Sequence, residues 1–355
     1  MLNIFDFTNE MLKEYLIKND FKPFAADQIF DWVYKKWELD FNNMLNLSKK
    51  LREHLSNNFE VQILSTLKSE VSIDKTIKNL NLLTDKKTIE TVLMQQEYGR
   101  SICVTTQVGC KMSCTFCASG LIKTERNLTT GEIVSQVYAM NLDLRKKFAQ
   151  NPIDENKSVS HIVIMGIGEP FDNFENVINF IKIVNDPKAL DIGIRHITVS
   201  TCGIVPKIFE FANLNMQVNL AISLHAPNNY IRNKLMPINK VYPIEKLIEA
   251  INYYIDKTNR RVTIEYILIE GINDSIDNAI ELSNIIKGIN CYVNLIPYNM
   301  VLENSYKKSR NILEFYNTLK SKKINVVIRK EYGSDINAAC GQLRAKQEGV
   351  LVDEI

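Results

Sequence analysis

The sequence predicts an α/β protein whose main part is a partial (β/α)6 barrel of the TIM type, with a small N-terminal helical domain and a short antiparallel β extension. Three observations support this fold class. After residue 100, short apolar runs alternate with amphipathic helical patterns, which is typical of parallel strands joined by right-handed crossovers. Six such units, rather than eight, indicate an incomplete barrel. The first 98 residues follow other patterns, helical at first and then strand-like.

The N-terminal part is predicted in two pieces. Residues 1–58 form a helical domain, because the segments 24–37 and 47–59 place apolar side chains at helical spacing. Residues 59–98 alternate apolar and polar side chains. This alternation is expected of antiparallel strands, and we interpret the segment as an extension that leads into the barrel.

The predicted barrel occupies residues 99–346, and residues 347–355 form a tail. The apolar runs that we expect to be strands are 101–107, 161–166, 195–201, 218–225, 262–269 and 292–298. The amphipathic segments between them include 131–148, 175–184, 244–255 and 278–287. Thr129 and Glu132 fit a capping box at the start of the first of these helices. Residues 325–333 are expected to add a last strand.

The overall composition excludes several classes of protein. Hydrophobic residues make up 45% of the chain and charged residues 24%, which is ordinary for a globular protein. No run of about 18 apolar residues is present, so we expect no membrane span. The N-terminal segment lacks the pattern of a signal peptide, and a cytoplasmic protein is therefore expected. A net charge of +2 does not by itself indicate a nucleic-acid partner.

The cysteine pattern favours a metal centre over a disulfide framework. Three of the seven cysteines, Cys110, Cys114 and Cys117, form a C-x3-C-x2-C pattern directly after the first barrel strand. Thiolates suit zinc or iron–sulfur clusters. A structural zinc site needs four protein ligands, and no second cysteine pair or nearby histidine is present, so a cluster is favoured with zinc as the alternative. Three ligands on a four-iron cluster leave one iron open to a substrate.

Unusual residues gather at the carboxyl ends of the predicted strands. They are the segment Met165–Pro170, Ser200, the segment Ser223–His225, and the segment Pro297–Asn299. In α/β barrels this rim carries the active site, because the loops there surround the mouth of the barrel. The distribution therefore predicts an enzyme.

These motifs resemble a known family. The cysteine loop after the first strand of a partial barrel is similar to the signature of the radical S-adenosylmethionine (SAM) enzymes. Eight segments between residues 88 and 346 resemble the RlmN-type RNA methyltransferases within that superfamily. The segments are CVTTQVGCKMSCTFCASG, RNLTTGEIVSQV, MGIGEP, STCGIVP, SLHAPN, KLMPIN, NLIPYN and DINAACGQLRAK.

The resemblance implies a reaction and its cofactors. Such enzymes methylate carbon 2 of an adenine in the peptidyl-transferase loop of 23S rRNA and, in some members, of the adenine 3′ of the anticodon in tRNA. The implied cofactors are one [4Fe–4S] cluster, held by Cys110, Cys114 and Cys117, and SAM as methyl donor and radical source. The implied partners are these RNAs and an electron donor such as a flavodoxin or ferredoxin system, without a membrane. The N-terminal helical domain is implied to help bind RNA.

The resemblance also implies the catalytic residues. Cys340 accepts a methyl group from one SAM, and a deoxyadenosyl radical from a second SAM removes a hydrogen atom from that methyl group. The methylene radical adds to carbon 2 and joins the enzyme to the RNA covalently. Glu90 then takes the carbon-2 proton, and Cys103 attacks Cys340 to form a disulfide that releases the product. Without the family, Cys103 is interpreted as a buried core cysteine and Glu90 as an exposed strand carboxylate.

Cofactor contacts are implied in the same way. Seven residues match the family's SAM-binding positions: Gly168, Glu169, Ser200, Ser223, Leu224, His225 and Asn299. Glu169 is expected to meet the amino group of the methionine moiety, and the neighbouring glycines allow close backbone approach. His225 alone also fits a structural histidine with satisfied hydrogen bonds. Cys202 and Cys291 are interpreted as small buried hydrophobic residues.

Two other functions remain open. A Cfr-type enzyme would methylate carbon 8 of the same rRNA adenine, although Val108 and Pro170 stand where that type favours cysteine and alanine. A non-catalytic metal-bearing RNA-binding module would have no need for Cys103, Cys340 and Glu90. Basic clusters would form a phosphate-binding rim if folding gathers them at the barrel mouth. They are Lys86–Lys87, Lys307–Arg310, Lys320–Lys323, Arg329–Lys330 and Arg344–Lys346.

Overall fold

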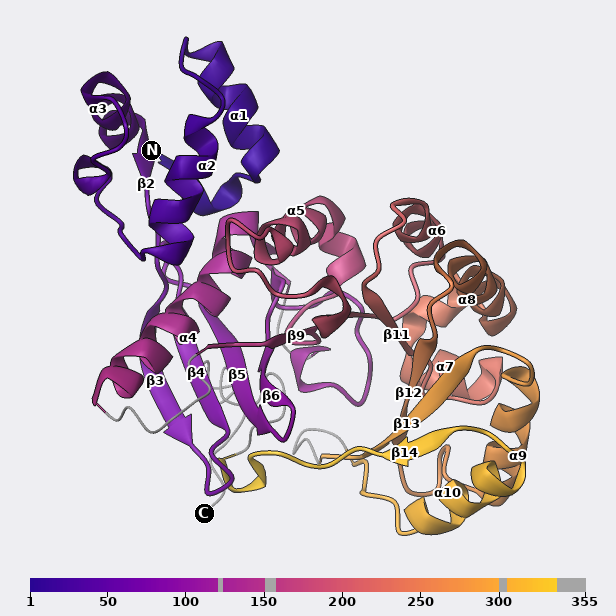
Figure 1. The fold of residues 1–355 in the computed structure, drawn as a ribbon. Helices are drawn as coiled ribbons and strands as arrows, with labels where there is room; N and C mark the ends of the chain where they lie inside the picture. Colours follow the sequence, from indigo (N-terminus) through magenta and orange to yellow (C-terminus); the bar gives the residue numbers. More distant parts are fainter. Residues whose placement is uncertain (121–123, 151–157, 300–304, 337–355) are drawn as a thin grey trace.

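One ten-stranded sheet organises the protein, as a computed structural model shows for residues 1–120, 124–150, 158–299 and 305–336. Its strand order is β14-β13-β12-β11-β10-β9-β6-β5-β4-β3. From β6 to β14 neighbouring strands are parallel, and from β3 to β6 they are antiparallel. Figure 1 shows the N-terminal helices as a lobe at one end of this sheet. The predicted α/β class is confirmed.

The N-terminal lobe is helical, as the apolar spacing predicts. Its helices are α1 (Asn9–Lys18), α2 (Ala25–Phe30) and α3 (Lys49–Asn58), with the short helices η1 (Ile4–Asp6) and η3 (Phe41–Asn43), and β1 (Leu2–Asn3) pairs with β2 (Phe59–Glu60). The helix expected over 24–37 is shorter, because α2 passes into a π-helical turn, η2 (Asp31–Lys35). The lobe packs on α4, where the Tyr138 hydroxyl donates to the Val33 carbonyl at 2.9 Å.

The antiparallel strands continue directly into the barrel sheet. They are β3 (Ser65–Val71), β4 (Ile77–Leu82), β5 (Thr88–Gln96) and β6 (Gly99–Cys103). The last of them also pairs with β9 in parallel, so one sheet runs without interruption from the predicted extension into the predicted barrel. Residue 107, expected as the end of the first barrel strand, instead belongs to β7 (Gln107–Val108), which pairs with β8 (Arg126–Asn127).

The parallel part follows the predicted alternation of strands and helices. The further strands are β9 (His161–Ile164), β10 (Ile197–Thr201), β11 (Asn219–Ser223), β12 (Val262–Leu268), β13 (Cys291–Pro297) and β14 (Val326–Ile328). The helices are α4 (Thr130–Gln150), α5 (Phe174–Asn185), α6 (Val205–Asn213), α7 (Asn229–Leu235), α8 (Ile244–Thr258), α9 (Ile276–Ile285) and α10 (Ile312–Ser321). Short 3-10 helices fill the connections: η4 (Ala118–Gly120), η5 (Pro170–Asn173), η6 (Ile194–His196), η7 (Pro237–Lys240) and η8 (Ser334–Ile336).

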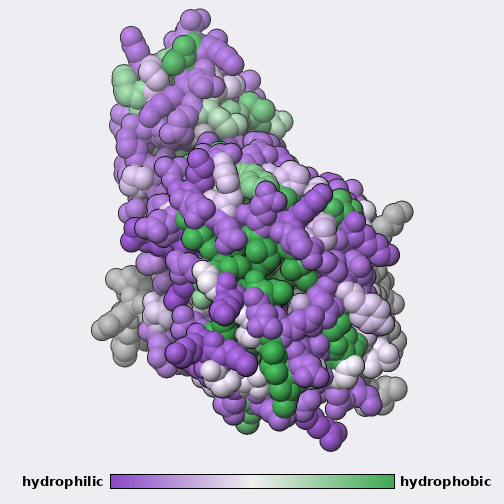
Figure 2. All heavy atoms as spheres, turned by 90° about the vertical axis from the view of Figure 1, so that its right-hand side faces the viewer, coloured by the Kyte–Doolittle hydropathy of each residue, from purple (hydrophilic) through white to green (hydrophobic). Residues whose placement is uncertain are grey.

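The core lies between these strands and helices. Strand residues such as Ile162, Ile222 and Val293 are fully buried, and they pack against the apolar faces of helices such as α5 and α8. Burial of such side chains is the main favourable term in folding. On the side of the molecule that carries α6 to α10, hydrophobic side chains gather within a mostly polar surface (Figure 2). Among the described residues, no helix combines the length and apolar character needed to cross a bilayer.

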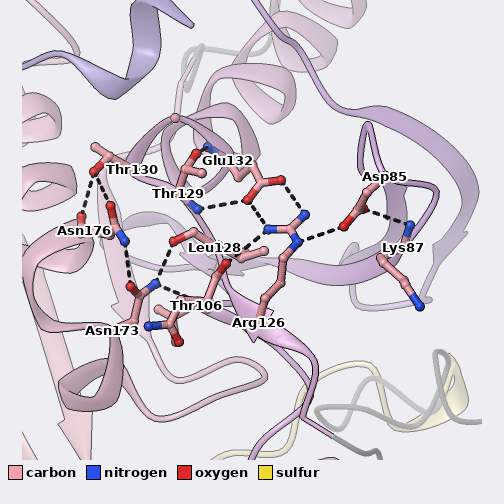
Figure 3. Close-up of polar contacts among 12 residues, drawn as sticks. Asp85, Lys87, Thr106, Arg126, Leu128, Thr129, Thr130, Glu132, Asn173 and Asn176 are labelled. Carbon is pink, nitrogen blue, oxygen red and sulfur yellow. Dashed lines mark hydrogen bonds and ion pairs between the residues drawn. The ribbon is translucent and has the colours of Figure 1, made fainter. Parts of the chain in front are cut away.

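A polar network fixes both ends of the cysteine-containing loop (Figure 3). The predicted capping box is confirmed, because the Thr129 amide donates to Glu132 at 2.9 Å and the Glu132 amide donates to the Thr129 hydroxyl at 3.2 Å. Arg126 donates to Glu132 at 2.7 and 2.8 Å and to Asp85 at 2.8 Å. This arginine holds the pKa of Asp85 below its usual value. Asn173 donates to the carbonyls of Thr106 and Leu128, and so ties the start of the loop to its end.

The last strand is shorter than expected, because the chain leaves the sheet after β14. The Arg329 amide still donates to Leu295 at 2.8 Å, and then residues 329–336, which we call the strap, cross to the far edge of the sheet (Figure 1). There Asp335 accepts from Ser72 and from the Ile73 amide, and the Gly333 amide donates to Asp74 at 2.9 Å. The strap therefore connects β14 to the β3–β4 turn.

Candidate active site

A cavity lies at the carboxyl ends of the parallel strands. Strand ends and loops from β9 to β13, the cysteine loop and the strap line it. The predicted site residues that line this cavity are Cys110, Cys114, Cys117, Gly168, Glu169, Ser200, Ser223 and His225. The fold thus brings together residues that lie more than 100 positions apart, on the rim where the sequence placed an active site.

The three motif cysteines come from one loop between β7 and η4. Turns shape this loop, since the Cys117 amide donates to the Cys114 carbonyl at 3.2 Å and the Gly120 amide donates to the Cys117 carbonyl at 3.0 Å. Burial raises the pKa of Cys110 to about 12 and that of Cys114 well above its usual value, and Cys117 adds to both shifts. Thiols in such a place stay protonated unless a metal displaces the proton.

The arrangement differs from a site for one metal ion. Within the described ranges, no three His, Cys, Asp or Glu side chains converge as they would around a single ion. In a four-iron cluster each thiolate binds its own iron atom, so the ligands do not meet at one point. Cys110, Cys114 and Cys117 nevertheless line the same cavity, so the three thiols are neighbours.

Glu169 presents a buried carboxylate to the cavity. Its oxygens accept from the Phe171 amide at 3.0 Å and from the Cys202 amide at 2.8 Å, which fixes the side chain. Desolvation raises the pKa of this carboxyl group, while the hydrogen bonds oppose that shift. A cationic ligand group would restore the charge balance at this point.

The glycines of the MGIGEP segment serve packing within the chain. A Cβ atom at Gly166 would lie 2.6 Å from the Val104 carbonyl oxygen, and one at Gly168 would lie 2.7 Å from the Gln107 Cβ. Gly168 also has a φ of +110°, which side chains disfavour. The expected close approach therefore exists, and its partner is the segment that follows β6. Both glycines also line the cavity.

His225 combines the two interpretations that its sequence context leaves open. Its Nδ1 accepts a hydrogen bond from the Ile267 amide at 3.1 Å, so the ring is neutral and carries its proton on Nε2. Burial lowers its pKa to about 3, and Arg232 contributes in the same direction. The ring packs edge-on against Phe116 of the cysteine loop, with centroids 5.0 Å apart, and lines the cavity.

Two of the predicted cofactor residues do not line the cavity. Leu224 is fully buried in the core, and its carbonyl accepts a hydrogen bond from Arg232 at 3.1 Å. Asn299 is exposed and follows the buried Tyr298. Ser200 and Ser223, at the ends of β10 and β11, do reach it.

The cavity also contains residues that the sequence analysis did not assign. Glu265 lies in the middle of β12, where burial raises its pKa and Asn294 donates to its carboxylate at 2.9 Å. An acidic residue within an otherwise apolar strand run was the signal for it. Cys202 is buried, as expected, but it also lines the cavity, and so does Arg329 of the strap. Cys202 belongs to the STCGIVP segment and Arg329 to a predicted basic cluster, but neither was assigned to the cofactor site.

A second group of predicted residues lies on one face of the antiparallel strands. Lys78, Val92 and Cys103 pair in register across β4, β5 and β6, so their side chains share a face, and Glu90 lies two residues from Val92 on the same face. Glu90 is 3% exposed, which contradicts its interpretation from sequence alone as an exposed carboxylate. The cause is the buried ion pair that it forms with Lys78, at 3.2 Å.

Cys103 connects this face to the cavity. It is buried in a small cluster with Val92 and Met94, and Met165 and Tyr332 pack against the cluster. Met165 also lines the cavity, so one side chain touches both groups of predicted residues. Cys340 lies outside the described residues. The Tyr332 side chain of the strap contacts the hydrophobic cluster around Cys103, and the strap ends four positions before Cys340.

The basic clusters are in part neutralised by acids. Lys87 pairs with Glu125, Lys308 pairs with Glu331 at 2.9 Å, and Arg310 pairs with Glu270 at 3.7 Å. Arg329 reaches the cavity, whereas Arg344 and Lys346 lie outside the described residues. Several side chains of the expected basic rim are therefore already paired with carboxylates, and fewer of them are available for phosphate groups.

The fold and the cavity define a class of protein, an α/β barrel enzyme with three cysteines of one loop at the mouth of the barrel. Residues 104–283 match the model of the Radical SAM superfamily, and residues 2–61 match the model described as the ribosomal RNA large subunit methyltransferase N-terminal domain. A crystal structure of a radical SAM methyltransferase from Sphaerobacter thermophilus superposes with a TM-score of 0.87 at 40% identity, covering 96% of this chain and 99% of that one.

Relatives in other bacteria extend over almost the whole chain. A Spiroplasma citri protein named "Probable dual-specificity RNA methyltransferase RlmN" is 56% identical over 351 residues, 99% of both chains. A Bacillus subtilis protein of the same name is 52% identical, over 97% of this chain and 93% of its own length. The chain belongs to the RlmN family of radical SAM methyltransferases, as the eight motifs indicated. Its cofactors are accordingly a [4Fe–4S] cluster and SAM.

The residues at the cavity fit these cofactors. Three neighbouring thiols at one place supply the soft ligands that iron–sulfur clusters use. The buried carboxylate of Glu169, whose pKa is raised by desolvation, suits the ammonium group of the methionine moiety. The cavity is lined by apolar side chains such as Met236 and Ile296 beside these polar groups, as small-molecule sites usually are.

Proposed function

We propose that this chain methylates carbon 2 of an adenine in the peptidyl-transferase loop of 23S rRNA, and of the adenine 3′ of the anticodon in some tRNAs. The reaction proceeds through a methylated cysteine and a covalent protein–RNA intermediate. The names of the relatives, dual-specificity RNA methyltransferases, support the class of substrate. One observation carries the mechanism: Glu90 and Cys103 share a buried face that Met165 joins to the cavity.

The cofactors are assigned to the cavity. Cys110, Cys114 and Cys117 would hold the cluster, and Glu169, Ser200, Ser223 and His225 would contact SAM together with Gly168. Leu224 and Asn299 are proposed from the family alone. When bound, these cofactors supply a carbon-centred radical. An electron donor of the flavodoxin or ferredoxin class provides the electron for that step.

Covalent catalysis answers a chemical difficulty. Carbon 2 of adenine is electron-poor and does not attack a sulfonium methyl group directly. We propose that the Cys340 thiolate first takes the methyl group of SAM in a two-electron transfer. The carbon-centred radical that the cofactors would supply takes one hydrogen atom from this methyl group, and the methylene radical left on the sulfur forms a carbon–carbon bond to adenine carbon 2.

Two residues would complete the reaction. The adduct loses one electron, which a bound cluster would take up, and its carbon-2 proton, which Glu90 accepts. The Cys103 thiolate then attacks the Cys340 sulfur, so that a sulfur–sulfur bond forms while the carbon–sulfur bond breaks. The electron pair remains on the methylene carbon, which takes a proton and becomes the product methyl group. A dithiol reductant restores the two thiols.

The chain length is compatible with this role of Cys340. Cys340 is four positions after Ile336, and four residues of chain span at most about 14 Å. Tyr332 of the strap packs against the hydrophobic side-chain cluster that contains Cys103. The strap therefore starts the C-terminal segment beside the proposed resolving cysteine.

The parts of the chain that bind RNA are proposed as whole segments, with one candidate side chain. We propose that residues 1–58 form an RNA-binding domain, which the description of the family model for residues 2–61 supports. Residues 59–98 and 99–346 are proposed as the strand extension and the catalytic barrel. Arg329, exposed at the cavity, is a candidate contact to a phosphate group near the target base.

Mass spectrometry of RNA tests the proposal. The chain is expressed in a bacterial host that lacks its own enzyme of this family, and digests of 23S rRNA and tRNA are compared with synthetic 2-methyladenosine and 8-methyladenosine. We expect 2-methyladenosine in both RNAs, and none with a Cys110→Ala variant as control. 8-Methyladenosine would instead identify a Cfr-type enzyme. RNA without methylation, from cells whose protein carries a full complement of iron and sulfide, would overturn the proposal.

A further inference from the structure

Arg232 is a fully buried cation beside the cysteine loop. It lies in α7, and its side chain has no solvent exposure. The guanidinium donates to four neutral oxygens, the carbonyls of Leu224 at 3.1 Å, Cys202 at 2.6 Å and Ser223 at 3.2 Å, and the Asn239 side chain at 3.0 Å. In the part of the chain that the structure describes, no carboxylate forms an ion pair with it.

The complete burial of the Arg232 guanidinium requires an explanation. Charged side chains are seldom fully buried unless an opposite charge lies near them, because the loss of hydration is large. Burial lowers the pKa of Arg232 to about 10, so it remains a cation at neutral pH. The side chains of Cys202 and Cys114 interact electrostatically with this guanidinium, and the second of these belongs to the C-x3-C-x2-C motif.

The helix that carries Arg232 is attached to the cysteine loop. The Thr115 amide, one residue after Cys114, donates to the Leu235 carbonyl at the end of α7 at 3.0 Å. The Thr115 hydroxyl donates to the Lys234 carbonyl at 3.4 Å. Apolar side chains of α7 and of the loop also pack in one cluster, which includes Leu235, Met236 and Cys114. The cation is thus held at a constant place relative to the thiols.

A cluster with three thiolates supplies the missing negative charge. The oxidised cubane core carries two positive charges and the thiolates three negative ones, which leaves one net negative charge. One-electron reduction adds another. Net charge and nearby groups set the reduction potential of such clusters. A fixed cation in a poorly solvated place therefore favours the reduced form over the oxidised form.

We propose that Arg232 is a positioning residue for the iron–sulfur cluster, whose buried charge compensates the three thiolates and raises the cluster's reduction potential. The inference rests on the proposed binding of the cluster by Cys110, Cys114 and Cys117. The same guanidinium donates hydrogen bonds to the carbonyls of Cys202 and Ser223, at the carboxyl ends of β10 and β11. It therefore also shapes the SAM side of the cavity.

Redox titration of the reconstituted protein tests the charge. Arg232→Met and Arg232→Lys are compared with wild type, and Arg100→Met serves as control because Arg100 is also buried but lies at the start of β6. Iron and sulfide are first determined after anaerobic reconstitution. The midpoint potential is then measured without SAM, by titration with detection of the reduced cluster by electron paramagnetic resonance.

We expect the Met variant to lower the equilibrium constant for reduction about tenfold, which is 59 mV for a one-electron couple. The Lys variant keeps the charge and should change it by less than about threefold, while its affinity for SAM falls because the carbonyl contacts are lost. An unchanged potential in a fully loaded Met variant would overturn the proposal. So would a tenfold change in the Lys variant, which remains decisive even where the Met variant does not fold.

The outcome separates this inference from the function on which it rests. Wild-type protein that takes up zinc, or no iron, contradicts the cluster assignment before any potential is measured. Wild-type protein with four irons and a potential insensitive to Arg232 contradicts only the role of the arginine. Neither reading depends on methylation of RNA.

Discussion

Lys78 and Glu90 form an ion pair at 3.2 Å in which the lysine side chain has no solvent exposure and the glutamate side chain is 3% exposed. The two lie on neighbouring strands, β4 and β5, on the face that also carries Cys103. The lysine gives the proposed base a defined partner in a buried place. Without it, the carboxylate would bear the full cost of desolvation.

Lys78→Met should therefore destabilise the protein by about 3–5 kcal/mol, because it removes the cationic partner of a buried carboxylate. The double variant Lys78→Met/Glu90→Gln should recover at least half of that loss, since both charges are gone. Urea unfolding of the three proteins measures these differences. The matched control is Lys308→Met, whose exposed pair with Glu331 should contribute less than about 1 kcal/mol. Additive losses in the double variant would mean that the two residues are not coupled.

Cys103→Ala should accumulate protein that is covalently joined to RNA, because the thiol attack that releases the product cannot occur. The adduct is detected by nuclease-sensitive retardation in denaturing gels of purified protein. Cys340→Ala should show neither adduct nor methylated product. Cys291→Ala is the control for a buried cysteine away from the site, and should methylate as wild type does. A Cys103→Ala enzyme with normal turnover would remove Cys103 from the mechanism.

Cys114→Ala and Cys202→Ala distinguish cluster ligands from other thiols of the same cavity. Both residues line it, and burial raises the pKa of both thiols. After anaerobic reconstitution we expect Cys114→Ala to lose most of the iron and sulfide, and Cys202→Ala to retain both. Equal loss in the two variants would show that the cavity as a whole, and not the three-cysteine motif, binds the metal.

His225 should make stability depend on pH. Its pKa in the folded protein is about 3, below the ordinary value of 6.5, so the unfolded chain binds the extra proton first. The stabilisation is complete above pH 6.5 and decreases as the pH falls towards 3. Relative to His225→Asn, wild type should lose about 1.4 kcal/mol per pH unit between pH 6 and 4.

Asparagine is the suitable replacement because it tolerates the positive φ of 56° at this position. Its side-chain oxygen can also accept from the Ile267 amide. Chemical unfolding at a series of pH values gives the comparison. Parallel curves for the two proteins would show that His225 does not titrate in this range.

Gly166→Ala should destabilise the protein by about 1–3 kcal/mol, because the new Cβ would lie 2.6 Å from a backbone oxygen that cannot easily move. Binding of SAM, measured by equilibrium dialysis, should weaken with it, since this glycine lines the cavity. Gly193→Ala is the control. There the nearest atom is 3.7 Å away and φ is −52°, so we expect a change within about 0.5 kcal/mol. Similar values for both variants would contradict the packing argument.

Much of the fold was predictable because its signals are local. The alternation of apolar runs and amphipathic helices reflects side-chain contacts within a few residues, and so the strands β9 to β13 lie close to their predicted positions. Helix α7 was missed, since seven residues give too short a pattern, and the last strand was expected to be longer. Its residues after Ile328 bond with Ser72 and Asp74, which are about 260 positions away in sequence.

The sequence by itself determined the family, because eight ordered motifs need no folded context, and three thiols within eight residues favoured a metal centre. The tertiary structure alone decided that Glu90 is buried against Lys78, that Glu265 enters the cavity, and that Arg232 is buried in a helix bonded to the cysteine loop. These facts depend on contacts between strands and helices far apart in the chain. A local sequence pattern does not predict which charged group a buried residue will contact in the folded protein.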